Sequence, residues 1–252
     1  MSNLALITGG QKGIGLGISK ALVAAGWEVA IASSSGADTA AVKEALAALG
    51  PKARYYQHDL RDIAAIDPLL AQIQNQQGPI HALISNAGVP ARQRGDMLDI
   101  TPDNFDFTLD INLRGAFFLA QAVARQMRMG GAESYRSIVF VTSVSASMAS
   151  VERAEYCISK AGAGMMAQLF AARLAGEGIG VFELRPGIIE TGMTAGVQEV
   201  YTARIEGGLV PARRWGQPAD IADVVLPMVS GQMRFANGAV VPVDGGLSIN
   251  RL

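Results

Sequence analysis

The chain has 252 residues, of which 50% are hydrophobic and 17% are charged, and its formal net charge is −1. A net charge so close to zero gives no general attraction for nucleic acid or an anionic membrane, so we expect neither as a partner. The single cysteine, Cys157, excludes an internal disulfide, and the two histidines, His58 and His81, lack zinc-site spacing. We therefore expect a globular, cytoplasmic protein that needs no metal of its own.

The N-terminal third alternates short apolar runs with amphipathic stretches. We expect strands at residues 4–8, 28–33, 53–58 and 81–85, and helices at residues 14–25, 38–49 and 63–74. This alternation is typical of a parallel sheet with right-handed crossovers.

The alternation continues beyond residue 100 with longer helices. We expect helices at residues 104–129, 155–174 and 218–229, and strands at residues 137–141, 180–184 and near Val240. The pattern weakens after Gly187, and long irregular segments of compact domains commonly cover binding sites, so we expect a substrate lid at residues 188–215. The fold class that follows is α/β, with one domain over residues 1–252 and helices on both faces of a doubly wound parallel sheet.

Three glycines, Gly9, Gly13 and Gly15, lie between the first expected strand and the first expected helix. Backbone without Cβ atoms can approach a pyrophosphate closely, and the N-terminus of the helix offers free N–H groups and a positive dipole end. A tight turn with close helix contact is the alternative interpretation. The strand–loop–helix order favours the dinucleotide site.

The second expected strand ends in serines where NAD-binding proteins carry an acidic residue for the ribose 2′-OH. The hydroxyls of Ser33 and Ser34 can donate to a 2′-phosphate, and Lys12 can supply a positive charge beside it. NADP(H) is therefore favoured, and NAD(H) stays possible. The alternative is that Lys12 is a solvated loop lysine and that the serines only end a strand.

Tyr156 and Lys160 are four residues apart on an expected helix, so they share one helix face. A tyrosine with a pKa of about 10 is a poor base near neutrality, and a nearby ammonium group is expected to lower that pKa. Ser143 lies just after the expected strand at residues 137–141, at the carboxyl end where sites of α/β proteins form, and can hydrogen-bond a substrate oxygen.

With these residues, the chain resembles the short-chain dehydrogenase/reductase family over essentially its whole length. The loop from Thr8 to Gly15 is similar to the family's cofactor loop, and Ser143, Tyr156 and Lys160 match its catalytic positions. Further motifs that resemble the family's are Asn86-Ala87-Gly88 after the fourth strand, Asn112 as the structural and proton-relay asparagine, and Pro186-Gly187 with Thr191 as the segment around the nicotinamide.

The resemblance implies a Rossmann-type fold and hydride transfer between a nicotinamide and a carbonyl carbon. Asn112, Ser143, Tyr156 and Lys160 would be catalytic: Tyr156 donates the proton, Ser143 stabilises the substrate oxygen, Lys160 also holds the nicotinamide ribose, and Asn112 supports a water relay. Asp59 resembles the family's adenine-side residue, with a turn or N-cap role as the alternative. The expected cofactor contacts are Gly9, Gln11, Lys12, Gly13, Ile14, Gly15, Ser33, Ser34, Asp59, Leu60, Asn86, Ala87, Gly88, Tyr156, Lys160, Pro186, Gly187, Ile189 and Thr191.

Within the family, the layout and the ending Val241–Gly246 resemble bacterial 3-oxoacyl-[acyl-carrier-protein] reductases, which implies a thioester-linked ketone as substrate and an acyl carrier protein as partner. Such carriers are acidic, so docking needs a basic surface, for which Arg125, Arg128 and Arg136 are candidates. Glu177 departs from this pattern, because carrier-protein reductases often have a basic residue there.

Two other functions stay open. One is a dehydrogenase of a sugar, polyol or other small alcohol, since the segment from Thr191 to Arg214 suits either an acyl chain or a polar ligand. The other is a non-catalytic cofactor-sensing regulator, which the complete set of Asn112, Ser143, Tyr156 and Lys160 disfavours. The family resemblance also implies a homotetramer. Cys157, Met165 and Met166 lie on the same expected helix as Tyr156 and are interpreted as packing residues.

Overall fold

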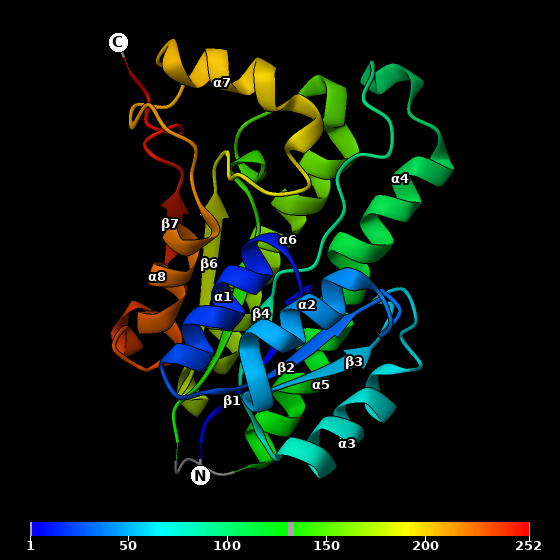
Figure 1. The fold of residues 1–252 in the computed structure, drawn as a ribbon, viewed down its shortest axis with the longest axis vertical. Coiled ribbons are helices and arrows are strands. Elements are labelled where there is room, and N and C mark those ends of the chain that lie inside the picture. Colours follow the sequence, from blue (N-terminus) through cyan, green and yellow to red (C-terminus); the bar gives the residue numbers. More distant parts are fainter. Residues whose placement is uncertain (1, 131–133, 252) are drawn as a thin grey trace.

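The computed structural model describes residues 2–130 and 134–251; the outer bounds of the expected domain, residues 1 and 252, lie outside these ranges. Seven parallel strands form one sheet in the order β3-β2-β1-β4-β5-β6-β7 (Figure 1). The strands are β1 (Leu4–Thr8), β2 (Glu28–Ser33), β3 (Ala53–Gln57), β4 (Ile80–Ser85), β5 (Arg136–Val141), β6 (Ile179–Pro186) and β7 (Val240–Val243). The expected doubly wound parallel fold is confirmed.

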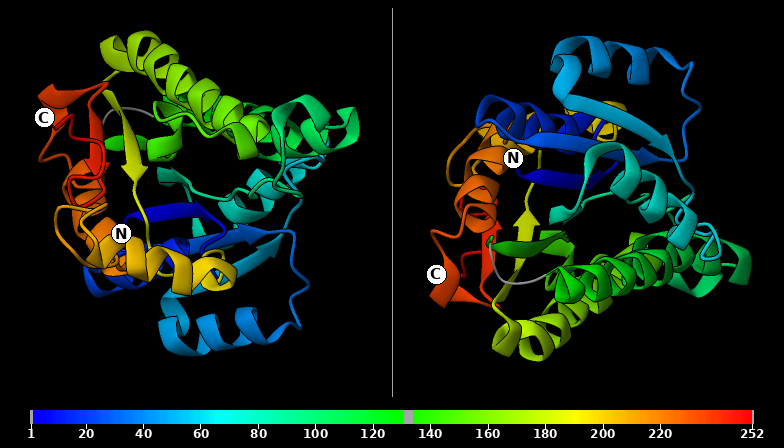
Figure 2. Two further views of the ribbon diagram at one scale, coloured as in Figure 1. Left: turned by 90° about the horizontal axis from the view of Figure 1, so that it is seen from above. Right: turned by 90° about the horizontal axis from the view of Figure 1, so that it is seen from below.

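The helices form two layers on opposite faces of the sheet, as Figure 2 shows from both ends. One layer contains α1 (Gly13–Ala24), α2 (Ala40–Leu49) and α8 (Pro218–Val229). The other contains α3 (Ile66–Gln77), α4 (Pro102–Leu109), α5 (Ala116–Met129) and α6 (Ala154–Leu174). No helix in the described ranges is both long and apolar enough to cross a membrane.

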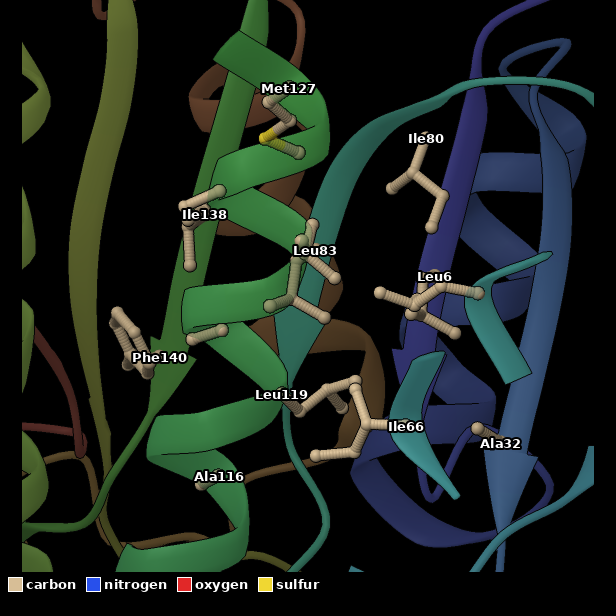
Figure 3. Close-up of a cluster of buried hydrophobic side chains, with 14 of the residues drawn as sticks. Leu6, Ala32, Ile66, Ile80, Leu83, Ala116, Leu119, Met127, Ile138 and Phe140 are labelled. Atoms are coloured by element: carbon tan, nitrogen blue, oxygen red, sulfur yellow. The ribbon is translucent and has the colours of Figure 1, made fainter. Parts of the chain in front are cut away.

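Alternate side chains of the central strands supply two separate cores. Leu4 and Leu6 of β1 face the layer of α3, α5 and α6, whereas Ala5 and Ile7 face the layer of α1 and α8. Figure 3 shows part of the first core, with Leu6 and Leu83 of two strands near Leu119 of α5. Because both faces are covered, β1 is buried along its whole length, and the rigid ends of such strands can hold a site in place.

The expected strands all form, with boundary differences of at most two residues at either end. The helices differ more. The third helix begins at Ile66 instead of residue 63, because the Asp62 side chain accepts a hydrogen bond from the Ala65 amide at 3.1 Å and completes a turn first. The segment expected to be irregular contains a helix, α7 (Gln198–Glu206), in which only Ile205 is fully buried. Figure 1 shows α7 at the end of the molecule to which the arrowheads of β6 and β7 point.

The single helix expected at residues 104–129 is wrong in one respect, since a π-helical turn at Asp110–Gly115 separates α4 from α5. The turn brings the chain very close to the loop after β3. A Cβ atom at Gly115 would lie only 2.1 Å from the Leu60 carbonyl oxygen, so only glycine fits there. Single π turns of this kind often mark functional positions, and this one carries Asn112.

Substitution of Gly115 tests this contact. We expect Gly115→Ala to lower the free energy of unfolding by at least about 2 kcal/mol, because the added methyl group overlaps a backbone oxygen that cannot rotate away. The control is Gly176→Ala, where a Cβ meets no atom within 4 Å and a change within about 0.5 kcal/mol is expected. Urea denaturation measures both, and equal stability of the two variants would contradict the close contact.

Candidate active site

The predicted site residues follow four neighbouring strands at their carboxyl ends. The glycine loop follows β1, Asn86-Ala87-Gly88 follows β4, Ser143 follows β5, and Pro186-Gly187 ends and follows β6. The chain order of the strands reverses between β1 and β4, since β2 and β3 extend the sheet on one side and β5 to β7 on the other. In open α/β sheets a ligand crevice forms outside the carboxyl ends at such a switch point.

A set of hydrogen bonds connects the two loops on either side of this switch point. The Thr8 hydroxyl oxygen accepts from the backbone amides of Asn86 at 3.0 Å and Ala87 at 2.9 Å. In return, the Asn86 side-chain amide donates to the Thr8 carbonyl oxygen at 2.9 Å. Thr8 is buried, so these bonds hold the glycine loop and the Asn86 loop at a fixed separation.

The glycine loop has the close contacts that its sequence predicts. Gly9 and Gly13 have φ values of +69° and +52°, in the left-handed region that favours glycine. A Cβ at Gly15 would lie 2.2 Å from the Gly9 carbonyl oxygen, and a Cβ at Gly13 would contact the Thr191 side chain at 3.3 Å. Thr191 is therefore beside the loop although 178 residues separate it from Gly13. Ile14 and Gly15 begin α1 directly after the loop, with Ile189 buried beneath Thr191.

Gln11 gives a further indication that this loop suits a polar ligand. The side chain is buried, its amide nitrogen donates to the Ser35 hydroxyl at 3.5 Å, and its carbonyl oxygen Oε1 has no hydrogen-bond partner among the described residues. A buried polar atom without a partner is costly, so an acceptor placed here calls for a donor from outside the chain. Together with the cradle formed by Gly9 and Gly13, it fits the hydroxyl-rich nucleotide of a nicotinamide cofactor.

Ser33 and Ser34 at the end of β2 differ in their hydrogen-bond partners and exposure. The Ser33 hydroxyl lies 2.7 Å from the Tyr55 hydroxyl, so it already has a partner, whereas Ser34 is exposed. Lys12 is also exposed at the N-cap of α1. A free hydroxyl and a free ammonium group therefore occur at this edge of the crevice.

The residues after β3 divide between two roles. Asp59 accepts from the Arg61 amide at 2.9 Å and forms an ion pair with the Arg61 guanidinium, and this hydrogen-bonded pair holds the Asp59 pKa below its ordinary value. Asp59 therefore has the turn role that was the alternative interpretation, and its carboxylate is already paired with Arg61. Leu60 is buried in the core and its carbonyl oxygen contacts Gly115, as described above.

Asn112 joins three elements around the π turn. Its side-chain oxygen accepts from the Val89 amide at 2.8 Å, and its nitrogen donates to the Val89 carbonyl at 2.9 Å and to the Ser159 hydroxyl at 3.1 Å. The Asn112 side chain is therefore fully engaged with the loop after β4 and with α6. Gly88 leaves room beside it: a Cβ there would be 3.1 Å from Asn112 Oδ1 and 3.4 Å from the Lys160 ammonium nitrogen.

Tyr156 and Lys160 lie one turn apart on α6, with Lys160 Nζ 5.7 Å from the centre of the Tyr156 ring. Lys160 is buried, and Nζ donates to the Val141 carbonyl at the end of β5 at 3.2 Å. Burial lowers the Lys160 pKa to about 8, because an ammonium group loses hydration there. The lysine is thus held within reach of both the tyrosine and the cofactor crevice.

The Tyr156 pKa differs from the expectation of a lowered value. Burial raises it above its ordinary value, while the Ser143 hydroxyl and the Arg153 guanidinium act in the opposite direction. The desolvation of the phenolate outweighs these favourable contacts. Tyr156 is therefore protonated at neutral pH and is suited to give a proton. Ser143 Oγ accepts from the Ser145 amide at 3.1 Å, which leaves the Ser143 hydrogen free to donate.

A buried ion pair that the sequence analysis did not identify supports the end of β5. Glu183 of β6 accepts from the Thr142 hydroxyl at 2.7 Å and from Arg185 at 2.7 and 3.1 Å. Thr142 directly precedes Ser143, so these bonds fix the chain that presents the Ser143 hydroxyl. Alternation along β6 could have revealed Glu183 as an acid on a buried strand.

Three predictions about side chains near the long helices are wrong. Arg136 is buried at the start of β5 and donates to the Met127 carbonyl, and Arg128 pairs with Glu177. Both lie at the amino-end side of the sheet, opposite the crevice, so they cannot form a docking surface at its mouth. Met166 fills the core as expected, but Met165 is 54% exposed.

Comparison with known proteins finds a sequence profile, a solved structure and a relative that each match nearly the whole chain. A sequence profile described as enoyl-(acyl carrier protein) reductase matches residues 9–248. The crystal structure of a 3-oxoacyl-[acyl-carrier protein] reductase from Brucella melitensis in complex with NAD is 45% identical, with a TM-score of 0.95 and coverage of 100% of this chain and 99% of that one. The 3-oxoacyl-[acyl-carrier-protein] reductase MabA of Mycobacterium bovis is 34% identical over 99% of this chain and 94% of its own length.

A third relative carries a different activity. The crystal structure of a gluconate 5-dehydrogenase from Burkholderia cenocepacia in complex with NADP and tartrate is 28% identical, with a TM-score of 0.90 and coverage of 100% of this chain and 97% of that one. The matches therefore span reductases of thioester-linked ketones and dehydrogenases of sugar acids on one fold.

Substitution of Thr8 tests how the switch point is held. Thr8→Val leaves the amides of Asn86 and Ala87 without an acceptor in a buried position, so we expect a loss of about 2–4 kcal/mol in the free energy of unfolding. Thr8→Ser keeps the hydroxyl and is expected to lose less than about 1.5 kcal/mol, the usual cost of one buried methyl group. Urea denaturation compares them, and a serine variant as unstable as the valine variant would show that the methyl group matters and the hydrogen bonds do not.

Proposed function

Because the chain belongs to the short-chain dehydrogenase/reductase family, whose members are oxidoreductases acting on CH–OH or C=O groups and use NAD(P), we propose that it reduces the ketone of 3-oxoacyl thioesters carried by an acyl carrier protein. The observation that carries the proton transfer is the placement of Tyr156 on α6, where Lys160 Nζ lies 5.7 Å from the centre of its ring. Burial raises the Tyr156 pKa, so the phenol holds a proton that it can donate. The substrate class follows the Brucella melitensis relative, which is similar over the whole chain.

In the proposed reaction, a bound nicotinamide nucleotide supplies the hydride to the ketone carbon. The Tyr156 hydroxyl gives its proton to the substrate oxygen as negative charge develops there, and the Ser143 hydroxyl donates a hydrogen bond to the same oxygen. Lys160 places a positive charge next to Tyr156 and can return a proton to the Tyr156 oxygen after the transfer. Asn112 keeps Ser159 and Val89, and with them α6 and the loop after β4, at the correct separation.

The cofactor side of the site follows from the residues around the glycine loop. Gly9, Gly13 and Gly15 with the N-terminus of α1 would hold the pyrophosphate, and Gln11 would bind a ribose hydroxyl with its free oxygen. NADP(H) is the proposed preference, because β2 ends without a carboxylate and both Lys12 and Ser34 are exposed there. The Brucella melitensis relative was crystallised with NAD, so NAD(H) remains the competitor.

The carrier protein would dock beside the mouth of the crevice. The loop after β4 reaches the segment before α6, since the Gly95 amide donates to the Glu152 carbonyl at 3.3 Å, and it carries exposed Arg92 and Arg94. These arginines replace Arg128 and Arg136, which lie at the opposite end of the sheet. Residues 188–215, including α7, would act as the substrate lid. A homotetramer stays a prediction, supported by exposed Ile158, Met165 and Leu169 on one face of α6.

A dehydrogenase of sugars or polyols is the second candidate, favoured by the gluconate 5-dehydrogenase relative. A cofactor-sensing regulator is disfavoured, because a protein that only senses the nucleotide needs no buried proton donor next to a lysine.

The substrate proposal is tested by NADPH oxidation with acetoacetyl thioesters beside a panel of ketoses, keto sugar acids and diketones. We expect the thioester to have the highest kcat/KM, and Tyr156→Phe to lower kcat by about 100-fold or more, because general acid catalysis typically contributes 10²–10⁴-fold. Cys157→Ala, one residue away on another helix face, is the control and should keep its activity. Efficient sugar turnover with negligible thioester turnover would replace the proposed substrate, and an unaffected Tyr156→Phe variant would remove the proposed mechanism.

The cofactor preference is tested with NADPH and NADH as alternative reductants. We expect wild-type protein to prefer NADPH and Lys12→Glu to raise the KM for NADPH by about 10- to 100-fold, the effect of losing a hydrogen bond to a charged group, with little change for NADH. Lys20→Glu on the exposed side of α1 is the matched control for the change in charge. A wild-type preference for NADH, or equal effects of Lys12→Glu on both reductants, would contradict the assignment.

A further inference from the structure

Arg153 lies next to Tyr156, and the sequence analysis did not identify it as a site residue. It occupies the N-cap position of α6, three residues before Tyr156. Its guanidinium carbon lies 5.5 Å from the centre of the Tyr156 ring, on a half-buried side chain. A positive charge is thereby held against the face of the proposed proton donor.

Weak hydrogen bonds connect Arg153 to the other catalytic hydroxyl. One terminal nitrogen lies 3.5 Å from the Ser145 hydroxyl, and Nε lies 3.4 Å from the Ser150 hydroxyl. Ser145 in turn donates its backbone amide to Ser143 Oγ at 3.1 Å. Arg153 and Ser143 are therefore connected through Ser145, and both lie beside Tyr156.

Arg153 forms no ion pair with any acidic side chain in the described parts of the chain, although its neighbours in sequence include Glu152 and Glu155. Five other arginines do have such partners: Arg61, Arg128, Arg173, Arg185 and Arg214. An arginine has five N–H donors in a planar fork, and the two long contacts to serines leave most of this capacity unused. The guanidinium lies against the Tyr156 ring, so these unused donors are beside the proposed proton donor.

We propose that Arg153 selects the substrate by binding a second oxygen acceptor, a carbonyl or carboxylate oxygen two carbons from the ketone that is reduced. The proposal rests on the reductase function above and narrows its substrate to compounds with a 1,3 arrangement of oxygens. In a 3-oxoacyl thioester this acceptor is the thioester carbonyl, and in a 3-oxo acid it is the carboxylate. Both suit a guanidinium, which can give two parallel N–H donors to a carboxylate and one or two converging N–H donors to a single carbonyl oxygen.

Such a contact orients the ketone as well as binding it. Ser143 and Tyr156 hold the ketone oxygen, and Arg153 holds the second oxygen, so the chain between them is fixed at two points. Two-point attachment restricts rotation of the reacting carbon, which raises the fraction of bound substrate in a reactive geometry. A ketone without the second oxygen would bind through one point and gain nothing from Arg153.

The experiment compares two substrates that differ only in the second oxygen. One is the acetoacetyl thioester of N-acetylcysteamine, and the other is its thioether analogue, in which a methylene replaces the thioester carbonyl. A third, 3-oxobutanoate, carries a carboxylate at the same distance. Each is measured with wild-type protein, with Arg153→Gln, and with Arg114→Gln, which removes one exposed positive charge to which no role is assigned and serves as the control for a general field.

We expect Arg153→Gln to lower kcat/KM for the thioester by about 10- to 100-fold, the usual effect of losing a hydrogen bond to a charged group, and that for the thioether analogue by less than about threefold. Arg114→Gln should change kcat/KM for neither substrate. Equal losses on both substrates, with the alkaline limb of the pH profile shifted upwards, would mean that Arg153 acts only by lowering the pKa of Tyr156 and would overturn the proposal.

The third substrate separates this proposal from the proposed function. Wild-type turnover of 3-oxobutanoate but not of the thioester, with the former lost in Arg153→Gln, would support the role of Arg153 and reject the thioester substrate. Turnover of the thioester that is insensitive to Arg153→Gln would keep the function and reject the role. A wild-type enzyme that reduces only ketones without a second oxygen would reject both.

Discussion

The Thr8 hydroxyl joins the two halves of the sheet at the place, between β1 and β4, where the chain order of the strands reverses. Its two amide donors belong to the loop after β4, while its own backbone leads into the glycine loop. A crevice between two loops keeps its width only if the loops are tied to each other, and here one buried oxygen satisfies two amides that would otherwise lack an acceptor. The positions of Gly9, Asn86 and, through Gly88, Asn112 and Lys160 all depend on this tie.

Burial gives the site its electrostatic character. Lys160 and Tyr156 are desolvated together, which lowers the pKa of the first to about 8 and raises that of the second. Both shifts favour the uncharged form, so the site resists forming a phenolate until another charge balances it. Arg153 is the group that lowers the Tyr156 pKa by its charge, from a side chain that water still reaches. Burial therefore has the largest effect on the Tyr156 pKa, and the Ser143 hydroxyl and the Arg153 charge oppose it.

The sequence predicted the parts of the molecule that repeat a regular pattern. Strand positions, the two helix layers and the placement of the four catalytic candidates around one edge follow from periodicity and from the motifs. The π turn at Asp110–Gly115 was not predicted, because it lies against the Leu60 carbonyl oxygen, and this contact joins residues that are 55 positions apart in the sequence. Helix α7 was missed because only Ile205 is buried, so little apolar periodicity marks it. The direction of the Tyr156 pKa depends on desolvation, which spacing does not report.

Substrate choice lies outside the rigid frame. The residues that fix the reaction are attached to strand ends or to the buried face of α6, whereas those that can touch the remainder of a substrate belong to the loop after β4, the segment before α6 and the region of α7. Loops can change without disturbing the sheet, so relatives named as 3-oxoacyl-[acyl-carrier-protein] reductases and as a gluconate 5-dehydrogenase can share one fold. A charged residue that is neither paired nor fully solvated is therefore informative in these loops, since the fold gains little from it. Arg153 meets this description, and its position against Tyr156 connects recognition of the substrate to the proton that the substrate receives.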